Sequence, residues 1–436
     1  MFEAGLLLCF WTARLPVTTQ RRAISRDAWL LIAGQGVRAA GYGFTAVLLG
    51  ALLAAKGYTP LEVGVVLTAL IAGTAVASLA TGAFADRVGR RRSYGLFFAG
   101  IAAAGLIVAL GVPFWMLLVI ALTGTLSTDV IDNGPATTLE QSMLAAEDAG
   151  TAMVYGRYNM VGSACGALGA LAVSVSGLAR GGHAGPSGWW FAVLLPVGLA
   201  GVALASRLSA ATEIPPDGQA QSARPTRARL GPSAHVVHRL AALFAVDAGG
   251  SGLVTTGFLS YYFASRYHVS IVSLGWLFFA VSVVQAGSVA LAPLLARRFG
   301  LVATMVGTHL PSNVLLAAVA FAPAFPVAAG LLLARTTLSQ MDVPTRQALV
   351  MAVVTPRERT AASGVTNAAR YTVRPIGPLV AGAVQQLALG APLVVAGAVK
   401  GAYDVTLWIW ARTRLPEGGR KVQRSVAANK MEEDLS

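Results

Sequence analysis

The apolar residues of this chain come in long blocks of about 20 residues or more, separated by short polar or Pro- and Gly-rich gaps. A helix needs about 20 apolar residues to cross the hydrocarbon layer of a bilayer. Only 12% of the 436 residues are charged, which is too few to cover the surface of a soluble fold. The pattern therefore predicts an all-α membrane protein.

Twelve such blocks can be counted, and each one predicts a transmembrane helix. Two pairs of blocks are separated only by Pro-containing turns, at 111–113 and 323–326, and such turns are typical of helical hairpins. The predicted spans are 29–54, 61–84, 93–112, 114–139, 151–178, 187–206, 236–263, 271–296, 301–322, 325–353, 359–388 and 391–411.

The placement of Lys and Arg predicts the orientation, because short basic loops stay on the cytoplasmic side. With the N-terminus inside, the inner segments hold most of the 33 basic residues, whereas the outer loops hold Lys56, Arg180 and Arg266. We expect a multi-pass protein of the cell (inner) membrane with both termini in the cytoplasm. The net charge of +14 then needs no nucleic-acid partner, since the basic residues lie between the apolar blocks.

Three matches at nearly one offset indicate an internal duplication. The segment 82–89 after span two matches 293–300 after span eight, 211 residues later. Asp132 matches Asp342 at an offset of 210, and Gly156 matches Gly364 at an offset of 208. The predicted organisation is a cytoplasmic extension (1–28), an N-terminal six-helix half (29–208), a cytoplasmic linker (209–238), a C-terminal six-helix half (239–412) and a cytoplasmic tail (413–436).

The loop between spans two and three carries a defined motif, made of Gly82, Asp86, Arg87, Gly89, Arg90 and Arg91. A loop that only had to be basic in order to stay in the cytoplasm would not need Asp86 or either glycine. The spacing resembles the signature loop of the major facilitator superfamily, G-x-x-x-D-R/K-x-G-R/K-R/K. The resemblance implies a fold of 12 transmembrane helices in two six-helix pseudo-repeats, and a secondary active transporter that works by alternating access. It also implies that this loop is a cytoplasmic latch, with Asp86 and Arg90 as its principal residues.

Ionisable residues inside spans are costly and usually line a cavity or pair with one another. Arg38, Asp247, Arg335 and Arg370 come out roughly 12 to 17 Å from the ends of their spans, near the middle of the bilayer. In the superfamily, spans one, four, seven and ten line the central pathway. The predicted substrate or proton pathway therefore centres on Arg38, Asp247 and Arg335. It also includes Arg370 at similar depth, and Gln35, Asn159 and Asn367 as hydrogen-bonding residues.

Asp247 is the predicted proton carrier of this set, because a buried carboxyl can be shifted toward neutral pH while arginine keeps its proton. The arginines at similar depth favour an anionic or zwitterionic solute. The alternative is that these charges are buried ion pairs that hold the helices together. Nearer the predicted cytoplasmic ends, we expect an inner gate formed by Asp132, Asp342, Arg346 and Arg374.

The sequence features that bear on the solute and on the direction of transport are the glycine and proline patterns of spans five and eleven. Span five has Gly162, Gly166 and Gly169 without the proline of the drug/proton antiporter pattern, so these residues indicate close helix packing. Gly377-Pro378 in span eleven resembles the broad exporter branch, so proton-coupled efflux of drugs or small metabolites is the first prediction. An uptake symporter for a small organic solute, with an anion as one option, is the second. A non-transporting membrane sensor or scaffold is the alternative from another class.

An enzyme is not expected, because no nucleophile or metal-ligand spacing is present and only His309 of the five histidines lies within a predicted span. The two cysteines, Cys9 and Cys165, are too far apart to indicate a metal site. We therefore expect no catalytic residues, no metal and no cofactor. The expected partners of a monomer are the lipid bilayer, a small-molecule substrate and, as the coupling ion, protons.

Overall fold

The computed structural model describes residues 24–128, 134–144, 151–178, 186–213, 230–355 and 358–414. Every regular element in these ranges is a helix, so the predicted all-α fold class is confirmed. The first half contains α2 (Arg26–Ala55), α3 (Pro60–Val88), α4 (Arg90–Ala109), α5 (Phe114–Leu122), α6 (Pro135–Leu144), α7 (Thr151–Leu178), η1 (Gly188–Val193), α8 (Leu194–Ser206) and η2 (Ala210–Thr212). The second half contains α9 (Ala234–Gly252), α10 (Thr256–Tyr267), α11 (Ile271–Phe299), α12 (Leu301–Val319), α13 (Phe325–Ser339), α14 (Asp342–Val353), α15 (Arg359–Val373), α16 (Ile376–Gln385) and α17 (Ala391–Arg414).

Nine stretches of the described chain are long and apolar enough to cross a membrane, and one of them joins α9 and α10. The other three predicted spans are each divided into two shorter helices: α5 and α6, α13 and α14, and α15 and α16. Proline explains the position of two of these breaks. It lacks a backbone N–H and disfavours the continuation of a helix, and Pro135 begins α6 while Pro375 lies between α15 and α16. The arrangement agrees with twelve predicted spans, of which several are discontinuous.

Two glycines confirm the predicted repeat at the level of the backbone. Gly89 joins α3 directly to α4 with φ +100°, and Gly300 joins α11 directly to α12 with φ +87°. Both dihedral angles lie in a region that L side chains rarely adopt, so each turn requires glycine. The two positions are 211 residues apart, which is the offset seen between the two sequence segments.

Within each half, equivalent helices pack together. In the first half α2 packs on α7 and α4 on α8, and in the second α9 packs on α15 and α12 on α17. The contact between α2 and α7 is very close, because a Cβ added at Gly169 would lie 2.0 Å from the Ala40 carbonyl oxygen. The glycines of span five thus allow close helix packing, as the sequence predicted.

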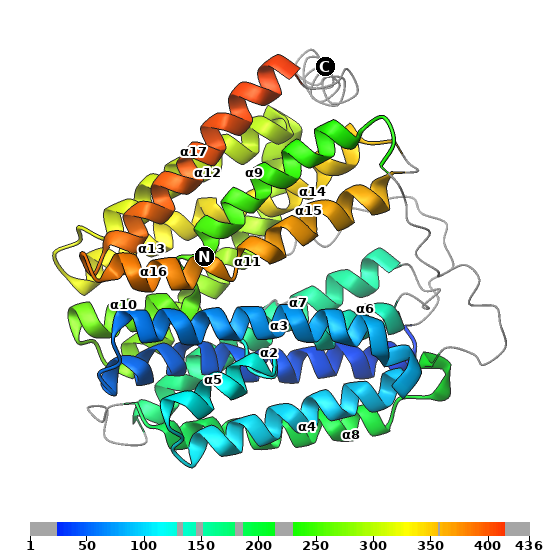
Figure 1. Ribbon diagram of the computed structural model, residues 1–436, viewed down its shortest axis with the longest axis vertical. Coiled ribbons are helices and arrows are strands. Elements are labelled where there is room, and N and C mark those ends of the chain that lie inside the picture. Colours follow the sequence, from blue (N-terminus) through cyan, green and yellow to red (C-terminus); the bar gives the residue numbers. More distant parts are fainter. Residues whose placement is uncertain are drawn as a thin grey trace, which may run out of the picture.

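The two halves meet at one end of the bundle, where α2 contacts α10, α3 contacts α16 and α7 contacts α11. Ser174 Oγ donates to the Val272 carbonyl at 2.9 Å, and Ser260 Oγ donates to the Val47 carbonyl at 2.6 Å. Figure 1 shows that the helices of the two halves diverge toward the other end, where α15 and α6 are well separated. We call these the closed end and the open end. The sequence predicts that the open end faces the cytoplasm.

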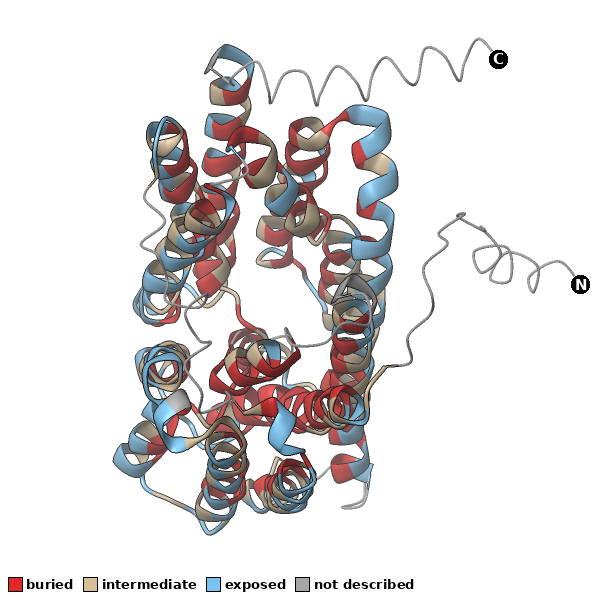
Figure 2. Cartoon of the chain, turned by 90° about the vertical axis from the view of Figure 1, so that its right-hand side faces the viewer, coloured by how far each residue is buried: buried red, intermediate tan, exposed pale blue. Residues whose placement is uncertain are grey.

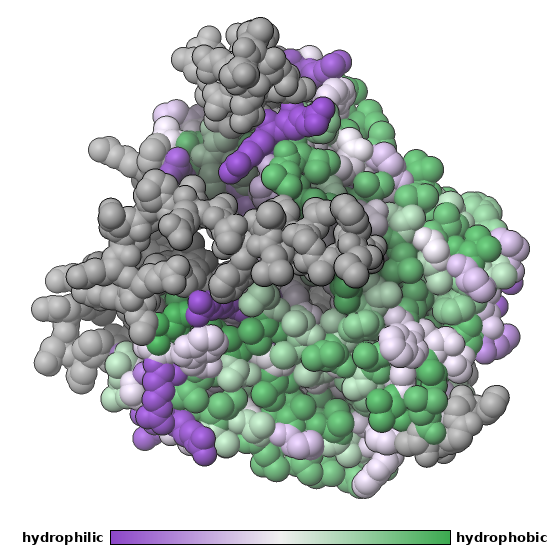
Figure 3. Space-filling view, turned by 180° about the vertical axis from the view of Figure 1, so that it is seen from behind, coloured by the Kyte–Doolittle hydropathy of each residue, from purple (hydrophilic) through white to green (hydrophobic). Residues whose placement is uncertain are grey.

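The outer surface is suited to lipid. Large apolar side chains such as Leu79, Leu110 and Phe321 are strongly exposed, while buried residues face the spaces between helices (Figure 2). The face shown in Figure 3 is mostly hydrophobic around the middle of the molecule. A surface of this kind would be unstable in water, so it supports a multi-pass membrane protein.

Candidate functional site

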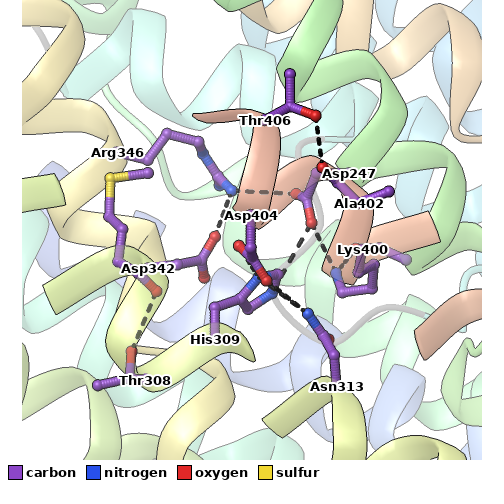
Figure 4. A network of polar contacts seen from close by, with 12 residues as sticks. Asp247, Thr308, His309, Asn313, Asp342, Arg346, Lys400, Ala402, Asp404 and Thr406 are labelled. Atoms are coloured by element: carbon purple, nitrogen blue, oxygen red, sulfur yellow. Dashed lines mark hydrogen bonds and ion pairs between the residues drawn. The ribbon is translucent and has the colours of Figure 1, made fainter. Parts of the chain in front are cut away.

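The main polar cluster of the second half is centred on Asp247 of α9 (Figure 4). Lys400 Nζ on α17 donates to Asp247 Oδ1 at 2.7 Å. The other carboxylate oxygen, Oδ2, lies 3.3 Å from Arg370 Nη1 on α15 and 3.4 Å from Arg346 Nη1 on α14. Asp342 binds Arg346 from one helical turn away, at 2.8 Å. Five helices therefore contribute to one network, counting α12 through His309, whose Nε2 is 3.9 Å from Asp247 Oδ1.

The breaks between helices determine where the side chains of this cluster lie. Residues 340–341 separate α13 from α14, so Asp342 and Arg346 lie in the first turns of a new helix instead of deep in a continuous one. Where α15 gives way to α16, Gly252 and Gly377 allow the backbones to touch, because a Cβ at Gly377 would lie 2.4 Å from the Gly252 carbonyl carbon. This close approach sets α9 against α15 and brings Arg370 to Asp247.

A cavity of about 440 Å³ lies beside the cluster. Its lining is formed by Phe244, Pro344, Arg346, Gln347, Ala348, Val350, Met351, Ser363, Thr366, Asn367 and Arg370. The side chain of Arg370 is 21% exposed and that of Arg346 is 11% exposed, whereas Asp247 is only 2% exposed. The two guanidinium groups therefore form part of the cavity wall, and the carboxylate that they share lies behind them.

Several buried polar atoms around this cluster have no hydrogen-bond partner among the described residues. They include the Tyr403 hydroxyl, Asn313 Oδ1 and Arg335 Nε. Tyr403 lies close enough to Asp247, Asp342, Arg346 and Asp404 to interact with them electrostatically. Unpaired buried polar atoms cost free energy unless water or a ligand satisfies them. Their concentration here marks this region as a candidate site.

The first half has a second, enclosed network around Arg38 of α2. Arg38 Nη2 lies 2.9 Å from Glu140 Oε2 on α6, and both side chains are fully buried. Glu140 also accepts hydrogen bonds from Tyr94 Oη at 2.6 Å and from the Tyr158 hydroxyl, while Gln35 accepts one from Arg38. A buried pair of this kind corresponds to the ion-pair alternative for the charges within spans, although Arg38 Nε has no hydrogen-bond partner among the described residues.

The predicted pathway residues are thus divided between two clusters. Asp247 and Arg370 come together with Arg346, which the sequence assigned to the gate, and Asn367 lines the same cavity. Arg38 and Gln35 belong to the other cluster. Asn159 is exposed on α7. Arg335 on α13 interacts electrostatically with Asp247 and Asp342.

Of the predicted gate residues, Asp342 and Arg346 form an ion pair. Arg374 lies at the end of α15, where its backbone N–H donates to the Arg370 carbonyl at 3.0 Å. Asp132 lies outside the described residues.

The latch motif lies at the open end. Gly82 is exposed on α3, Gly89 makes the turn, and Arg87 lies over the Phe84 ring at 5.8 Å. The side chain of Asp86 lies outside what the structure describes. The N-terminus of α4 is capped by Glu213, which accepts from the backbone N–H of Arg90 at 2.7 Å and of Arg91 at 3.1 Å. A carboxylate is favoured there because the helix dipole and free N–H groups attract anions.

Sequence reasoning gave no role in the site to Glu213, Lys400, Asp404 and His309. For Lys400, Asp404 and His309 a signal existed, since each is an ionisable residue inside an apolar block. Glu213 had no such signal, because it follows the last span of the first half in a polar segment.

The chemistry of the second-half cluster is that of an anion site. Two arginines share one carboxylate oxygen and face a cavity, and arginine is well suited to carboxylate and phosphate groups because its donors form a planar fork. Among the described residues no group of three His, Cys, Asp or Glu side chains could hold a metal ion.

Comparisons with known proteins agree with this architecture. Residues 31–419 match the family described as the Major Facilitator Superfamily. An uncharacterised membrane protein of Saccharomyces cerevisiae is 27% identical over 395 residues, with 83% of this chain and 88% of that protein covered.

Solved transporter structures share the fold. The nucleoside transporter NupG has a TM-score of 0.68 at 15% identity, covering 88% of this chain and 98% of that one. A bacterial homologue of the human lysosomal transporter Spinster, inward-facing and occupied, has a TM-score of 0.64 at 16% identity, covering 91% and 96%. A D-xylose-proton symporter has a TM-score of 0.64 at 16% identity, covering 90% and 98%. At these identities the similarity concerns the fold alone.

Proposed function

Because the chain belongs to the Major Facilitator Superfamily, whose members are membrane transporters, we propose that it carries a small organic anion across the membrane by alternating access. One observation carries the choice of solute: Arg346 and Arg370 line the same cavity and have one carboxylate, Asp247, between them. The solved transporters with this fold include carriers of nucleosides and of xylose, so the fold does not select the solute. The lining of the cavity has to do so.

The cavity supports an amphipathic anion. Its volume of about 440 Å³ is within the usual range for small-molecule sites. Phe244, Val350 and Met351 supply apolar surface, while Asn367 and Gln347 supply hydrogen-bonding groups. A carboxylate or phosphate of the bound solute would replace Asp247 Oδ2 as the partner of the two arginines. When the solute leaves, Asp247 pairs with the arginines again, so that no charge is left unpaired. The resident carboxylate thus allows the unloaded site to stay stable.

The orientation in this proposal places the open end in the cytoplasm of a cell whose inner membrane holds the protein. The open end carries the basic residues of the latch loop, Arg87 and Arg90 to Arg92, and also Arg297 and Arg298 at the end of α11. Such clusters stay on the cytoplasmic side during insertion. The conformation described is then inward-open, with the outer side sealed by the contacts of the closed end.

The structure favours efflux less than the sequence does. The prediction of efflux relied on Gly377-Pro378, with Gly382 nearby. Gly382 packs across the halves, where an added Cβ would lie 2.5 Å from the Pro60 carbonyl oxygen. Because close packing alone accounts for these glycines, they give no preference for one direction. Efflux stays a prediction, and uptake of an organic anion becomes its equal.

The test uses the purified full-length protein with succinate, citrate and adenosine monophosphate as probes, against succinamide and adenosine as uncharged counterparts. We expect the anions, and not the uncharged compounds, to raise the thermal unfolding temperature and to bind in calorimetry. Arg370→Ala and Arg346→Ala should each weaken binding about tenfold or more, because each removes a desolvated partner of the anion. Arg412→Ala is the matched control, since Arg412 lies over the Trp408 ring at the end of α17.

Counterflow of labelled probe into liposomes that contain the protein then reports transport. The proposal is wrong if the uncharged compounds bind as well as the anions. It is equally wrong if both arginine variants bind anions like the wild type.

A further inference from the structure

A buried polar pair lies behind the cavity, between α12 and α17. His309 Nδ1 is 2.9 Å from one oxygen of Asp404 and 3.0 Å from the other, and Asn313 Nδ2 donates to Asp404 at 2.8 Å. All three side chains are buried. Charged groups are costly in such a place, so they are usually retained for a function. The function proposed above leaves this pair unused.

The pair is connected to the anion site through one atom. His309 Nε2 lies 3.9 Å from Asp247 Oδ1, while Asp247 Oδ2 faces Arg346 and Arg370. The two ring nitrogens of His309 therefore face two different carboxylates. Whatever changes the charge on the ring acts on the carboxylate that holds the cavity arginines.

The other charged groups around His309 are few. From α17, Lys400 and Tyr403 lie beside it, with the Tyr403 ring 6.2 Å from the imidazole. On the far side of Asp247 lies Arg346 of α14, which is also paired with Asp342. Arg335 of α13 interacts with the carboxylates of Asp247 and Asp342. The charged residues of α11 are Arg297 and Arg298 at its far end.

The hydrogen bonds define what a proton would change. Asp404 as a carboxylate accepts, so we assign the proton of a neutral imidazole to Nδ1. Nε2 then presents a lone pair toward Asp247 Oδ1. When a proton adds to Nε2, the ring becomes a cation with one N–H directed at each carboxylate. Histidine is the side chain that ordinarily makes this change between about pH 5 and 8.

On the basis of the proposed function, we propose that His309 is the proton-coupling residue, and that its protonation prepares the cavity for the anion. The protonated ring attracts Asp247 Oδ1 together with Lys400 and reduces the hold of the carboxylate on Arg346 and Arg370. The two arginines become available to the solute. Proton and anion are then bound at the same time and cross in the same direction.

Asp247, the proton carrier predicted from the sequence, fits this role less well. It contacts Lys400, Arg346 and Arg370, and its neutralisation would leave these three cations facing one another. Arginine does not exchange its proton under physiological conditions. A proton on His309 instead places a new cation between two carboxylates, Asp247 and Asp404. Because His309 and Asp404 interact closely, the proton belongs to the pair.

Coupling of this kind is reciprocal, since the proton raises the affinity for the anion and the anion raises the affinity for the proton by the same factor. Where the proton gradient points into the cell, co-binding drives uptake of the anion. His309 thereby selects symport over the antiport that efflux would need.

The test measures binding of succinate, citrate and adenosine monophosphate to the full-length protein from pH 5.5 to 8.5, with proton uptake followed by a dye in weak buffer. For the probe that binds best, we expect affinity to rise about tenfold as pH falls across the range, with about half a proton taken up per anion near the midpoint of the change. His309→Gln should lose this dependence and keep only the part that comes from titration of the probe itself, such as the phosphate of adenosine monophosphate with a second pKa of about 6. His238→Gln, on the exposed start of α9, is the control and should behave as the wild type.

Asp404→Asn is the second variant, and it should move the pH profile to lower pH because the imidazolium loses its counter-ion. If the variants do not fold, a measurement on the wild type takes their place. In the wild type, the ¹⁵N-histidine signal of His309 should titrate at higher pH with anion bound. Unchanged pH dependence in His309→Gln, or an unmoved His309 titration, would overturn the coupling alone. Absence of anion binding at every pH would overturn the anion proposal first.

Discussion

Arg38 and Asp247 occupy corresponding places in the two halves, 209 residues apart, and carry opposite charges. Arg38 on α2 is paired with one carboxylate, Glu140, in a fully buried network. Asp247 on α9 is paired with three cations, two of which face a cavity. The duplicated fold has therefore placed a closed ion pair in one half and a cation-rich binding wall in the other.

This asymmetry predicts different effects for the two arginines. Arg38→Ala should lower the stability of the folded protein by about 3–5 kcal/mol, because it leaves the buried Glu140 carboxylate unpaired. Arg370→Ala should cost much less, since Arg370 is partly exposed and Asp247 keeps Lys400 and Arg346. The unfolding temperature in detergent, followed by tryptophan fluorescence, checks both.

A double variant separates an ion pair from a simple packing defect. Arg38→Met combined with Glu140→Met removes both charges and keeps much of the volume, so it should recover part of the stability lost in Arg38→Ala. A double variant less stable than either single change would show that the hydrogen bonds of Tyr94 and Tyr158, and not the charge pair, hold this region together.

The membrane fold could be predicted because hydropathy and charge are local properties of the sequence. Nine of the twelve predicted spans contain one of the long helical stretches, and the repeat was visible from three matches at nearly one offset, among them the segments that end at Gly89 and Gly300. The interruptions of the other three spans were harder to foresee, because a proline such as Pro135 or Pro375 can either kink a helix or mark its end. Which outcome occurs depends on the packing around them.

The site could be predicted only in part, for a related reason. Depth in the bilayer identified Asp247 and Arg370, but the pairing of charges depends on which helix face each one occupies. Lys400 and Asp404 are four residues apart on α17, yet Lys400 contacts Asp247 and Asp404 contacts His309. Only the packing of α17 against α9 and α12 determines these partners.

A bulky residue at Gly382 should destabilise the closed end. In Gly382→Val the new side chain would meet backbone atoms of Pro60, Leu61 and Gly64 within 3.1 Å, and backbone cannot move aside. The equilibrium should shift toward a conformation in which this end opens. A cysteine at Ser260, buried between the halves, should then react severalfold faster with a membrane-impermeant maleimide after Cys9 and Cys165 have been replaced.

Gly330→Val is the matched control for that experiment, because a Cβ at Gly330 on α13 meets no atom within 4 Å. Equal labelling rates in both variants would mean that the contact between α3 and α16 does not keep this end closed.

A disulfide across α7 and α11 should lock the closed end. A Cβ at Gly177 would lie 2.7 Å from a methyl group of Val272, so the pair Gly177→Cys and Val272→Cys is close enough to bridge. Oxidation should stop counterflow of the anion, and reduction should restore it, while anion binding from the open end persists. Transport that continues in the oxidised protein would exclude separation of these two helices as a step of the cycle.

The loop before α15 is anchored by Glu358, and this anchor should respond to pH. Its carboxylate accepts from the backbone N–H of Gly231 at 2.6 Å and of Ser233 at 3.3 Å, and from the hydroxyls of Thr355 and Ser233 at 2.7 and 2.8 Å. These hydrogen bonds lower the pKa of Glu358 to about 2, from about 4.3 for an ordinary glutamate. The folded pKa is the lower one, so the stabilisation is complete above about pH 4.3 and is lost as pH falls toward 2.

Glu358→Gln should therefore unfold at a lower temperature than the wild type at pH 7, because an amide group cannot accept all four hydrogen bonds. The difference between the two proteins should shrink at pH 3.5 and below, where the wild-type carboxylate begins to lose its advantage. Thr355→Val, which removes one donor, should show a smaller difference with the same pH trend. A difference of equal size at pH 7 and pH 3 would show that the shape of the side chain, and not its charge, anchors the loop.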